Sequence, residues 1–143
     1  MKEEFNILIT DRNPHVQEYL KCEMVAEGYL VRLAKTGREV IKWVYYHEPL
    51  DLLILDPDLP DTTIISLFEK LQNRIPALPV VVHTFLSDSV DFATGSIEVV
   101  FVEKSGSSVE NLKRAVADIL KKINPQRIQT AQTQKTATRR TLL

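Results

Sequence analysis

Four polar positions, each following an apolar run, give this 143-residue chain the means to hold a phosphoryl group. They are two carboxylates, Asp11 and Asp56, together with the hydroxyl of Thr84 and the ammonium of Lys104. A carboxylate can act as a nucleophile toward phosphorus, and a hydroxyl and an ammonium can stabilise the phosphoryl oxygens. The residue types therefore predict covalent phosphoryl chemistry at Asp56, provided that the fold brings the four together.

Five strands are predicted to position these residues. Short apolar runs of the kind found in buried strands cover residues 5–10, 29–34, 52–55, 80–82 and 99–102. The two acids, Thr84 and Lys104 each come shortly after one of these runs. The ends of the predicted strands are therefore the places where the chemistry is expected.

Between the strands, apolar residues recur at helical spacing. Asn13 and Pro14 are the expected N-cap and first residue of the first helix, and Thr36 with Glu39 forms a capping box for the second. A short fourth helix is expected within residues 85–95, and Ser107 or Ser108 is expected to cap the last. The apolar face of the first helix is predicted to consist of Val16, Tyr19, Leu20 and Met24. That of the third helix is predicted to consist of Ile64, Leu67, Phe68, Leu71 and Ile75. That of the last helix is predicted to consist of Val109, Leu112, Val116, Ile119 and Ile123.

The alternation of strand and helix predicts an α/β fold with a doubly wound parallel sheet, because parallel strands need crossover connections. Strands that are apolar throughout fit a sheet covered by helices on both faces. In such a sheet, ligands bind at the carboxyl ends of the strands. We expect one domain, residues 1–123, followed by a basic Thr- and Gln-rich tail, residues 124–143.

Charge and composition argue against several classes of partner. The formal net charge is -1, and the basic excess is confined to residues 124–143, so no direct nucleic-acid binding is expected. Cys22 is the only cysteine, which precludes an internal disulfide. The apolar runs are far shorter than the ~20 residues of a membrane-spanning helix, and acidic residues stand where a signal peptide needs an apolar run. We expect a soluble, cytoplasmic protein that does not bind membranes.

Four segments together resemble the landmark segments of response-regulator receiver domains from two-component signalling systems. They are ILITDRNP at residues 7–14, DLLILDPDLP at 51–60, VHT at 82–84 and FVEK at 101–104. Each segment alone is weak, but four in order, each at a predicted strand end, are specific. The resemblance covers residues 5 to about 123 and implies the flavodoxin-like (βα)5 fold with strand order 2-1-3-4-5.

The resemblance implies a role for each site residue. Asp56 would accept phosphate from a histidine kinase or phosphotransfer protein, and Thr84 and Lys104 would contact that phosphate. Asp11, Asp56 and the backbone carbonyl of Asp58 would bind Mg²⁺. A receiver of this kind is a phosphoacceptor with at most slow autophosphatase activity, and not an enzyme in the usual sense.

Output is also implied by the resemblance. Phe101 would be the aromatic residue that changes rotamer when Thr84 moves. The signal would then reach a downstream protein through the face built from the fourth helix, the fifth strand and the fifth helix. The chain would be a monomer or a weak homodimer.

Two positions depart from the family pattern. Receivers usually carry two adjacent acids after the first strand, but here Arg12 follows Asp11. Because Mg²⁺ favours concentrated negative charge, we predict weak Mg²⁺ binding. Arg12 could pair with Asp56 and replace the metal, or bind the phosphoryl group through two parallel hydrogen bonds. Ser105 stands after Lys104, where the family often has Pro.

Each assignment has a simpler structural alternative. Asp56 could be an ordinary acid at a strand end, Asp11 a helix cap and Thr84 a strand former. Arg12 and Lys104 could be solvated charges, and Phe101 a core residue. His15, His47 and His83 have no metal-binding spacing and are assigned structural roles. Two rival functions remain for the whole chain. One is a pseudo-receiver that binds partners without phosphorylation, which Arg12 favours. The other is a haloacid dehalogenase-type phosphohydrolase, suggested by the Asp-x-Asp spacing of Asp56 and Asp58 but disfavoured by the short chain.

Overall fold

A computed structural model describes residues 4–46, 49–85 and 94–123. Its elements are, in chain order, β1 (Asn6–Thr10), α1 (Pro14–Ala26), β2 (Leu30–Ala34), α2 (Gly37–Tyr45), β3 (Leu52–Leu55), α3 (Ile64–Leu71), β4 (Val80–Thr84), β5 (Val99–Glu103) and α4 (Ser108–Ile123). The strands pair in parallel, in the order β2-β1-β3-β4-β5. The predicted parallel sheet and its strand order are confirmed.

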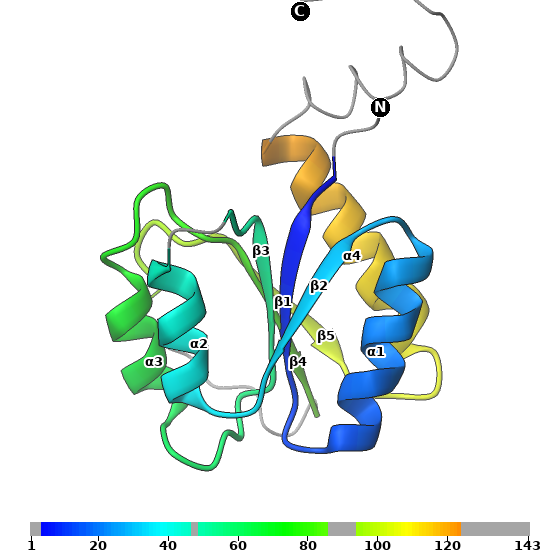
Figure 1. Cartoon of the computed structure of the whole chain (residues 1–143), viewed down its shortest axis with the longest axis horizontal. Coiled ribbons are helices and arrows are strands. Elements are labelled where there is room, and N and C mark those ends of the chain that lie inside the picture. The colour runs from blue at the N-terminus through cyan, green and yellow to red at the C-terminus, as the bar shows by residue number, and fades with distance from the viewer. Residues whose placement is uncertain (1–3, 47–48, 86–93, 124–143) are drawn as a thin grey trace, which may run out of the picture.

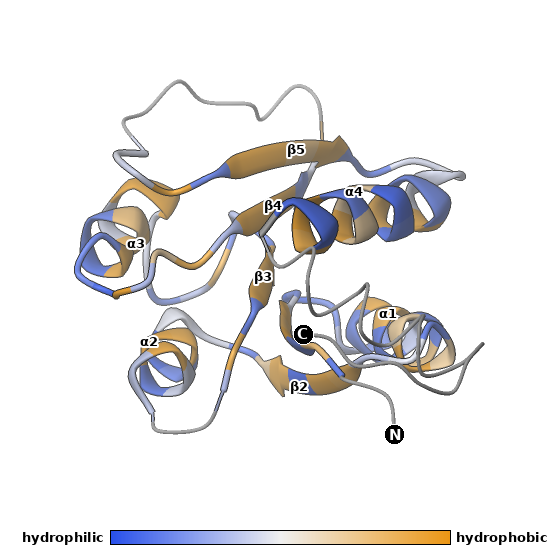
Figure 2. Ribbon diagram, turned by 90° about the horizontal axis from the view of Figure 1, so that it is seen from above, coloured by the Kyte–Doolittle hydropathy of each residue, from blue (hydrophilic) through white to orange (hydrophobic). Residues whose placement is uncertain are grey.

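The sheet lies between two helical layers, with α2 and α3 on one face and α1 and α4 on the other (Figure 1). Alternate residues of β3 serve the two layers, because successive side chains of a strand point to opposite faces. Leu53 and Leu55 pack in the core with α2 and α3. Leu52 and Ile54 pack in the core with α1 and α4. Burial on both faces explains why this strand is apolar throughout, and Figure 2 shows the apolar sides of the helices turned toward the sheet.

Local signals in the sequence account for the starts of two helices. The side chain of Asn13 accepts a hydrogen bond from the backbone N–H of His15, with Pro14 as the first residue of α1. Thr36 accepts from the N–H of Glu39 at 3.1 Å, and the Glu39 side chain accepts from the N–H of Lys35 at 2.6 Å. Both expected caps are therefore confirmed.

Two predicted core residues are instead exposed. Tyr19 lies on the surface, and the buried polar residue of α1 is Gln17, whose side-chain amide donates to the carbonyl of Ala34 at 2.7 Å. Ile75 is 92% exposed and lies beyond α3, which ends at Leu71. The residue before a proline is disfavoured in helical conformation, and Ile75 precedes Pro76, so helical spacing there does not indicate a helix. The expected fourth helix falls largely on residues 86–93, and it and the tail at 124–143 lie outside the described residues.

The loop after β3 also holds the start of α2. The carboxylate of Asp61 accepts hydrogen bonds from the backbone N–H groups of Gly37 at 2.7 Å and Arg38 at 3.0 Å. These donors lower the pKa of Asp61. A Cβ atom on Gly37 would collide with Cγ2 of Thr62, so glycine is needed where the loop and helix meet.

Replacing Asp61 should therefore destabilise the fold. We expect Asp61→Ala to lower the free energy of unfolding by about 1 kcal/mol, the usual effect of losing a helix N-terminal cap. Urea denaturation followed by circular dichroism measures this change. Asp118→Ala, at an exposed position of α4, is the matched control and should change the free energy by less than about 0.5 kcal/mol. Equal effects of the two substitutions would contradict the capping role.

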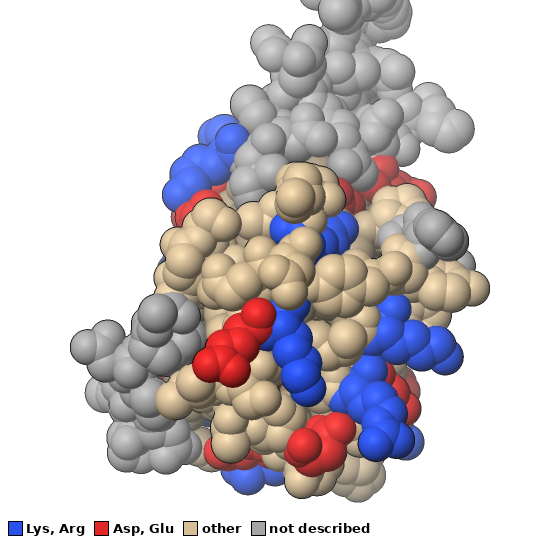
Figure 3. Space-filling model, turned by 90° about the vertical axis from the view of Figure 1, so that its left-hand side faces the viewer, with Lys and Arg blue, Asp and Glu red and all other residues tan. Residues whose placement is uncertain are grey.

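The surface over α2 and α3 carries charges of both signs, interspersed among uncharged side chains (Figure 3). This face therefore offers no extended patch of one sign for a polyanion. Within residues 4–46, 49–85 and 94–123, no helix has the length and apolar character needed to cross a membrane.

Candidate functional site

The parallel sheet brings three of the predicted residues to one edge. Asp11 follows β1, Asp56 follows β3 and Lys104 follows β5, so all three lie at the carboxyl ends of their strands. This edge is where ligands bind in open α/β sheets. Asp11 and Asp56 are both buried, and only 1% of Asp56 is exposed. Burying a carboxylate is costly unless hydrogen bonds or cations compensate for the lost water, and both are present here.

Backbone groups from two loops hold Asp56. Its Oδ2 accepts from the N–H of Arg12 at 2.9 Å, and its Oδ1 accepts from the N–H of Asp58 at 3.0 Å. Its own backbone N–H donates to the hydroxyl of Thr10 at 3.1 Å. The carboxylate is therefore fixed at the centre of the site by the loops after β1 and β3.

Lys104 supplies a cation to both acids. Its Nζ lies 3.2 Å from Oδ2 of Asp11 and 3.8 Å from Oδ2 of Asp56. Its backbone N–H donates to the carbonyl of Thr84 at 2.7 Å, which anchors it beside β4. Asp11 does not act as the helix cap: its Oδ1 accepts from the N–H of Asn13, which is itself the cap of α1. Lys104 is thus a member of the site and not a solvated surface lysine.

Arg12 lies beside both Asp56 and Asp58. Its Nε is 4.0 Å from Oδ2 of Asp56, and its Nη1 is 3.5 Å from Oδ2 of Asp58. Half of the Arg12 side chain is exposed, whereas Asp56 beneath it is buried. Of the two roles considered from the sequence, this geometry fits the pairing of Arg12 with Asp56.

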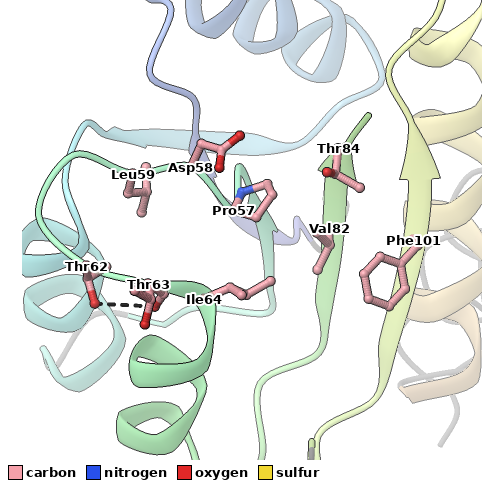
Figure 4. A pocket seen from close by; sticks show the side chains of 9 residues that line it. All are labelled: Pro57, Asp58, Leu59, Thr62, Thr63, Ile64, Val82, Thr84 and Phe101. Carbon is pink, nitrogen blue, oxygen red and sulfur yellow. Dashed lines mark hydrogen bonds between the residues drawn. The ribbon is translucent and has the colours of Figure 1, made fainter. Parts of the chain in front are cut away.

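Thr84 and Phe101 lie on the neighbouring side of the site. Together with Pro57, Asp58 and Val82 they border a cavity of about 310 Å³ (Figure 4). The Thr84 hydroxyl donates to the carbonyl of Phe85 at 3.2 Å. Phe101 is 45% exposed and is therefore not an ordinary core residue. The structure places the hydroxyl and the aromatic ring beside one shared space.

Comparison with known proteins agrees with this geometry. A family model described as "Response regulator receiver domain" matches residues 7–99, more than half of the chain. This chain belongs to the receiver-domain family.

Curated receivers with related sequences are longer than this chain. The transcriptional regulatory protein KdpE of Mycobacterium tuberculosis is 33% identical over 85 residues, which are 59% of this chain but 37% of KdpE. The regulator GlrR of Escherichia coli is 28% identical over 67% of this chain and 21% of its own length. The receiver therefore matches only a part of each of these regulators, and their whole-protein activities do not carry over directly.

Solved receivers share the fold. The response regulator TrrA of Thermotoga maritima, in complex with Mg²⁺-BeF, has a TM-score of 0.70 at 26% identity, covering 84% of this chain and 100% of TrrA. TrrA has also been solved in complex with the histidine kinase ThkA. The receiver domain of a Luxo repressor protein from Vibrio parahaemolyticus has a TM-score of 0.71 at 22% identity, covering 87% and 95% of the two chains. These likenesses confirm the flavodoxin-like receiver fold.

A divalent cation fits the donor set of this receiver poorly. Mg²⁺ requires several hard oxygen ligands in near-octahedral geometry. Here two buried carboxylates, Asp11 and Asp56, already face Lys104, and the neighbouring position holds the guanidinium of Arg12. In the part of the chain that the structure describes, no group of three His, Cys, Asp or Glu residues is placed to hold a metal ion. The weak Mg²⁺ binding expected from the sequence stays a prediction.

His83 is a residue of the site that the sequence did not reveal. It is only 4% exposed, and its Nε2 lies 3.2 Å from the hydroxyl oxygen of Ser108. Burial and the nearby Lys104 ammonium lower the pKa of His83 to about 4, against the opposite effect of Asp11 and Asp56. The side chain is therefore neutral at neutral pH. Its place directly before Thr84 was the only signal in the sequence.

This lowered pKa predicts acid sensitivity. Folded His83 binds a proton less readily than the unfolded chain, whose histidine pKa is about 6.5. Its contribution to stability is therefore complete above pH ~6.5 and is lost as the pH falls toward the folded value. Carboxylates also titrate in this range, so the variant comparison isolates His83. The free energy of unfolding should fall for both proteins between about pH 7 and pH 4.5. The fall should be smaller by roughly 2 kcal/mol for His83→Leu than for the wild type. Equal losses in urea denaturation would show that His83 is not responsible.

Proposed function

We propose that this receiver accepts a phosphoryl group on Asp56 from a histidine kinase or phosphotransfer protein. The observation that carries the proposal is the setting of Asp56, whose two oxygens are held by backbone N–H groups while Lys104 and Arg12 lie within 4.0 Å. Such a carboxylate is oriented and surrounded by positive charge where phosphoryl oxygens would gather. The likeness to TrrA, which has been solved with its kinase ThkA, supports a kinase as the donor.

The transfer is a substitution at phosphorus. A carboxylate oxygen of Asp56 attacks the phosphorus atom of a phosphohistidine, the P–N bond breaks, and its electron pair stays on the imidazole nitrogen. The product is an acyl phosphate on Asp56 and a neutral histidine on the donor. Lys104 and Arg12 offset the charge of the transferred oxygens, and the Thr84 hydroxyl would donate to one of them after releasing the carbonyl of Phe85. Hydrolysis of this acyl phosphate would be at most a slow autophosphatase activity.

Arg12 would carry out part of the work that a metal ion performs in related receivers. It is a permanent cation beside Asp56 and is tied to Asp58 in the loop after β3. We therefore expect phosphorylation with only a weak dependence on Mg²⁺. Asp11, Asp56 and the carbonyl of Asp58 remain the residues that would hold such an ion.

Output would pass through protein contact. The cavity shared by Thr84 and Phe101 gives the Phe101 ring space to turn inward when Thr84 moves toward the phosphoryl group. Phe101 lies on β5, and the expected output face combines this strand with α4 and the segment 86–93, which lies outside the described residues. We further propose that the receiver domain covers residues 1–123 and signals to a downstream protein. We also propose that it is monomeric or weakly dimeric and lies in the cytoplasm.

A pseudo-receiver is the second candidate, and one observation favours it. The Asp56 carboxylate is almost fully buried, and the Nε atom of the half-exposed Arg12 side chain lies 4.0 Å from it, so Arg12 would keep the donor from reaching it. Such a receiver would bind its partner without phosphorylation. The two candidates differ in whether Asp56 ever reacts.

Incubation with acetyl phosphate, with and without Mg²⁺, tests the proposal. Intact-mass measurement should show the gain of one phosphoryl group by the wild type. Asp56→Asn should gain none, while Asp58→Asn, which changes an exposed carboxylate of the same loop, should still gain it. Folded wild-type protein without any gain under either condition would favour the pseudo-receiver.

A further inference from the structure

His83 belongs to the same cluster as the phosphoacceptor but has no part in the transfer itself. The register pairs Leu55 of β3 with Val82 of β4, so Asp56 and His83 are the next residues toward the carboxyl edge of these two strands. Ile54 and Val81, one pair earlier, pack on the side of α1 and α4. By alternation along the strands, the side chains of Asp56 and His83 face that same side.

Two buried polar atoms of this cluster lack a hydrogen-bond partner. They are Oδ2 of Asp11 and Nδ1 of His83. Among the described residues, no other buried side-chain nitrogen or oxygen atom lacks a hydrogen-bond partner. Oδ2 of Asp11 lies 3.2 Å from the ammonium nitrogen of Lys104. Buried polar atoms are nearly always hydrogen-bonded in folded proteins, and an exception calls for an explanation. Here both exceptions occur beside Lys104.

The two atoms are chemically complementary. A neutral imidazole ring such as that of His83 carries one N–H and one acceptor nitrogen. The Ser108 hydroxyl lies 3.2 Å from Nε2 and can donate to it. With the Ser108 hydroxyl taken as the donor of this pair, the ring proton is assigned to Nδ1, which makes Nδ1 a donor. The unpaired oxygen of Asp11 is an acceptor.

We propose that His83 is a positioning residue whose Nδ1–H binds Asp11 when Lys104 turns to the phosphoryl group on Asp56. This inference rests on the proposed phosphorylation. Lys104 is now shared between Asp11 and Asp56, and added negative charge on Asp56 draws the ammonium toward it. Asp11 would otherwise lose its counter-charge while buried, in a receiver whose Arg12 disfavours the metal ion. A hydrogen bond from His83 holds Asp11 in place, and Ser108 orients the ring.

Three substitutions separate this role from a structural one. His83→Asn keeps an amide near the position of Nδ1, His83→Gln keeps one near Nε2, and His83→Leu keeps only the volume. The rate of phosphoryl gain from acetyl phosphate is measured by intact mass without added Mg²⁺, on variants whose fold is verified by circular dichroism. We expect His83→Asn to stay within about threefold of the wild type, and the other two to be slower by roughly tenfold, the effect of one hydrogen bond to a charged group.

Equal rates for all four proteins, or equal slowing of all three variants, would overturn the role of His83. If the variants do not fold, the imidazole ¹⁵N spectrum of the wild type decides: protonation at Nδ1 is expected, and protonation at Nε2 would overturn the inference. A wild type that gains no phosphoryl group rejects the proposed function and this inference together. A wild type that gains it while the variants show no Nδ1-specific pattern rejects the inference alone.

Discussion

Arg12→Asp should convert this receiver into one that binds Mg²⁺ at least about tenfold more tightly, because Mg²⁺ affinity depends on the number of charged oxygen ligands. The substitution removes a guanidinium that lies 4.0 Å from Oδ2 of Asp56 and places a third carboxylate beside Asp11. Near a protein surface, two unit charges about 4 Å apart interact by roughly 4 kcal/mol. The substitution changes the local charge by two units, so the interaction energy with a bound cation changes by several kcal/mol. The expected tenfold change is therefore a conservative bound.

Isothermal titration calorimetry with Mg²⁺ measures this affinity. Lys35→Asp is the matched control, because it makes the same change of charge. Lys35 is exposed and borders the same cavity of about 580 Å³ as Arg12. Unlike Arg12, Lys35 makes no ion pair with Asp56. Its Mg²⁺ affinity should stay close to that of the wild type. If both variants gain affinity equally, the overall charge and not the position of Arg12 determines metal binding.

Phe68→Ala should lower the free energy of unfolding by about 3–5 kcal/mol, the range for truncating a buried aromatic side chain. Among the residues that the structure describes, Phe68 is the largest fully buried side chain, and it lies in the core between the sheet and the α2–α3 layer. Its removal leaves a cavity that rigid neighbours on β3 and β4 cannot fill.

Urea denaturation of Phe68→Ala and of Ile75→Ala provides the comparison. Ile75 lies shortly after the same helix but is 92% exposed, so its truncation should cost less than about 0.5 kcal/mol. A loss at Ile75 as large as that at Phe68 would mean that the apolar residues after Leu71 are buried in solution, contrary to the described fold.

The fold could be predicted from the sequence because its signals are local. The uninterrupted apolar run at residues 52–55 predicts a strand that is covered on both faces, and the caps at Asn13 and Thr36 mark where two helices begin. Parallel strands then require their carboxyl ends to meet at one edge. That requirement is enough to bring Asp11, Asp56 and Lys104 together.

The rest depends on contacts between distant segments. Helical spacing alone cannot distinguish the buried Leu71 from the exposed Ile75, because the difference arises where the helix ends. The cap that Asp61 supplies to α2 joins residues 24 positions apart. His83 joins the site only because the register of β3 and β4 sets it beside Asp56. Whether Arg12 pairs with Asp56 or stays in solvent was likewise decided by the approach of two loops.

Chemical trapping of the acyl phosphate shows whether Asp56 is the residue that accepts the phosphoryl group. After incubation with acetyl phosphate, borohydride reduces an aspartyl phosphate to homoserine, and peptide sequencing by mass spectrometry then locates the altered residue. We expect homoserine at position 56 in the wild type and in Asp58→Asn, and none in Asp56→Asn. Homoserine at Asp11 or Asp58, or its absence from folded wild-type protein, would contradict the assignment of Asp56 as the phosphoacceptor.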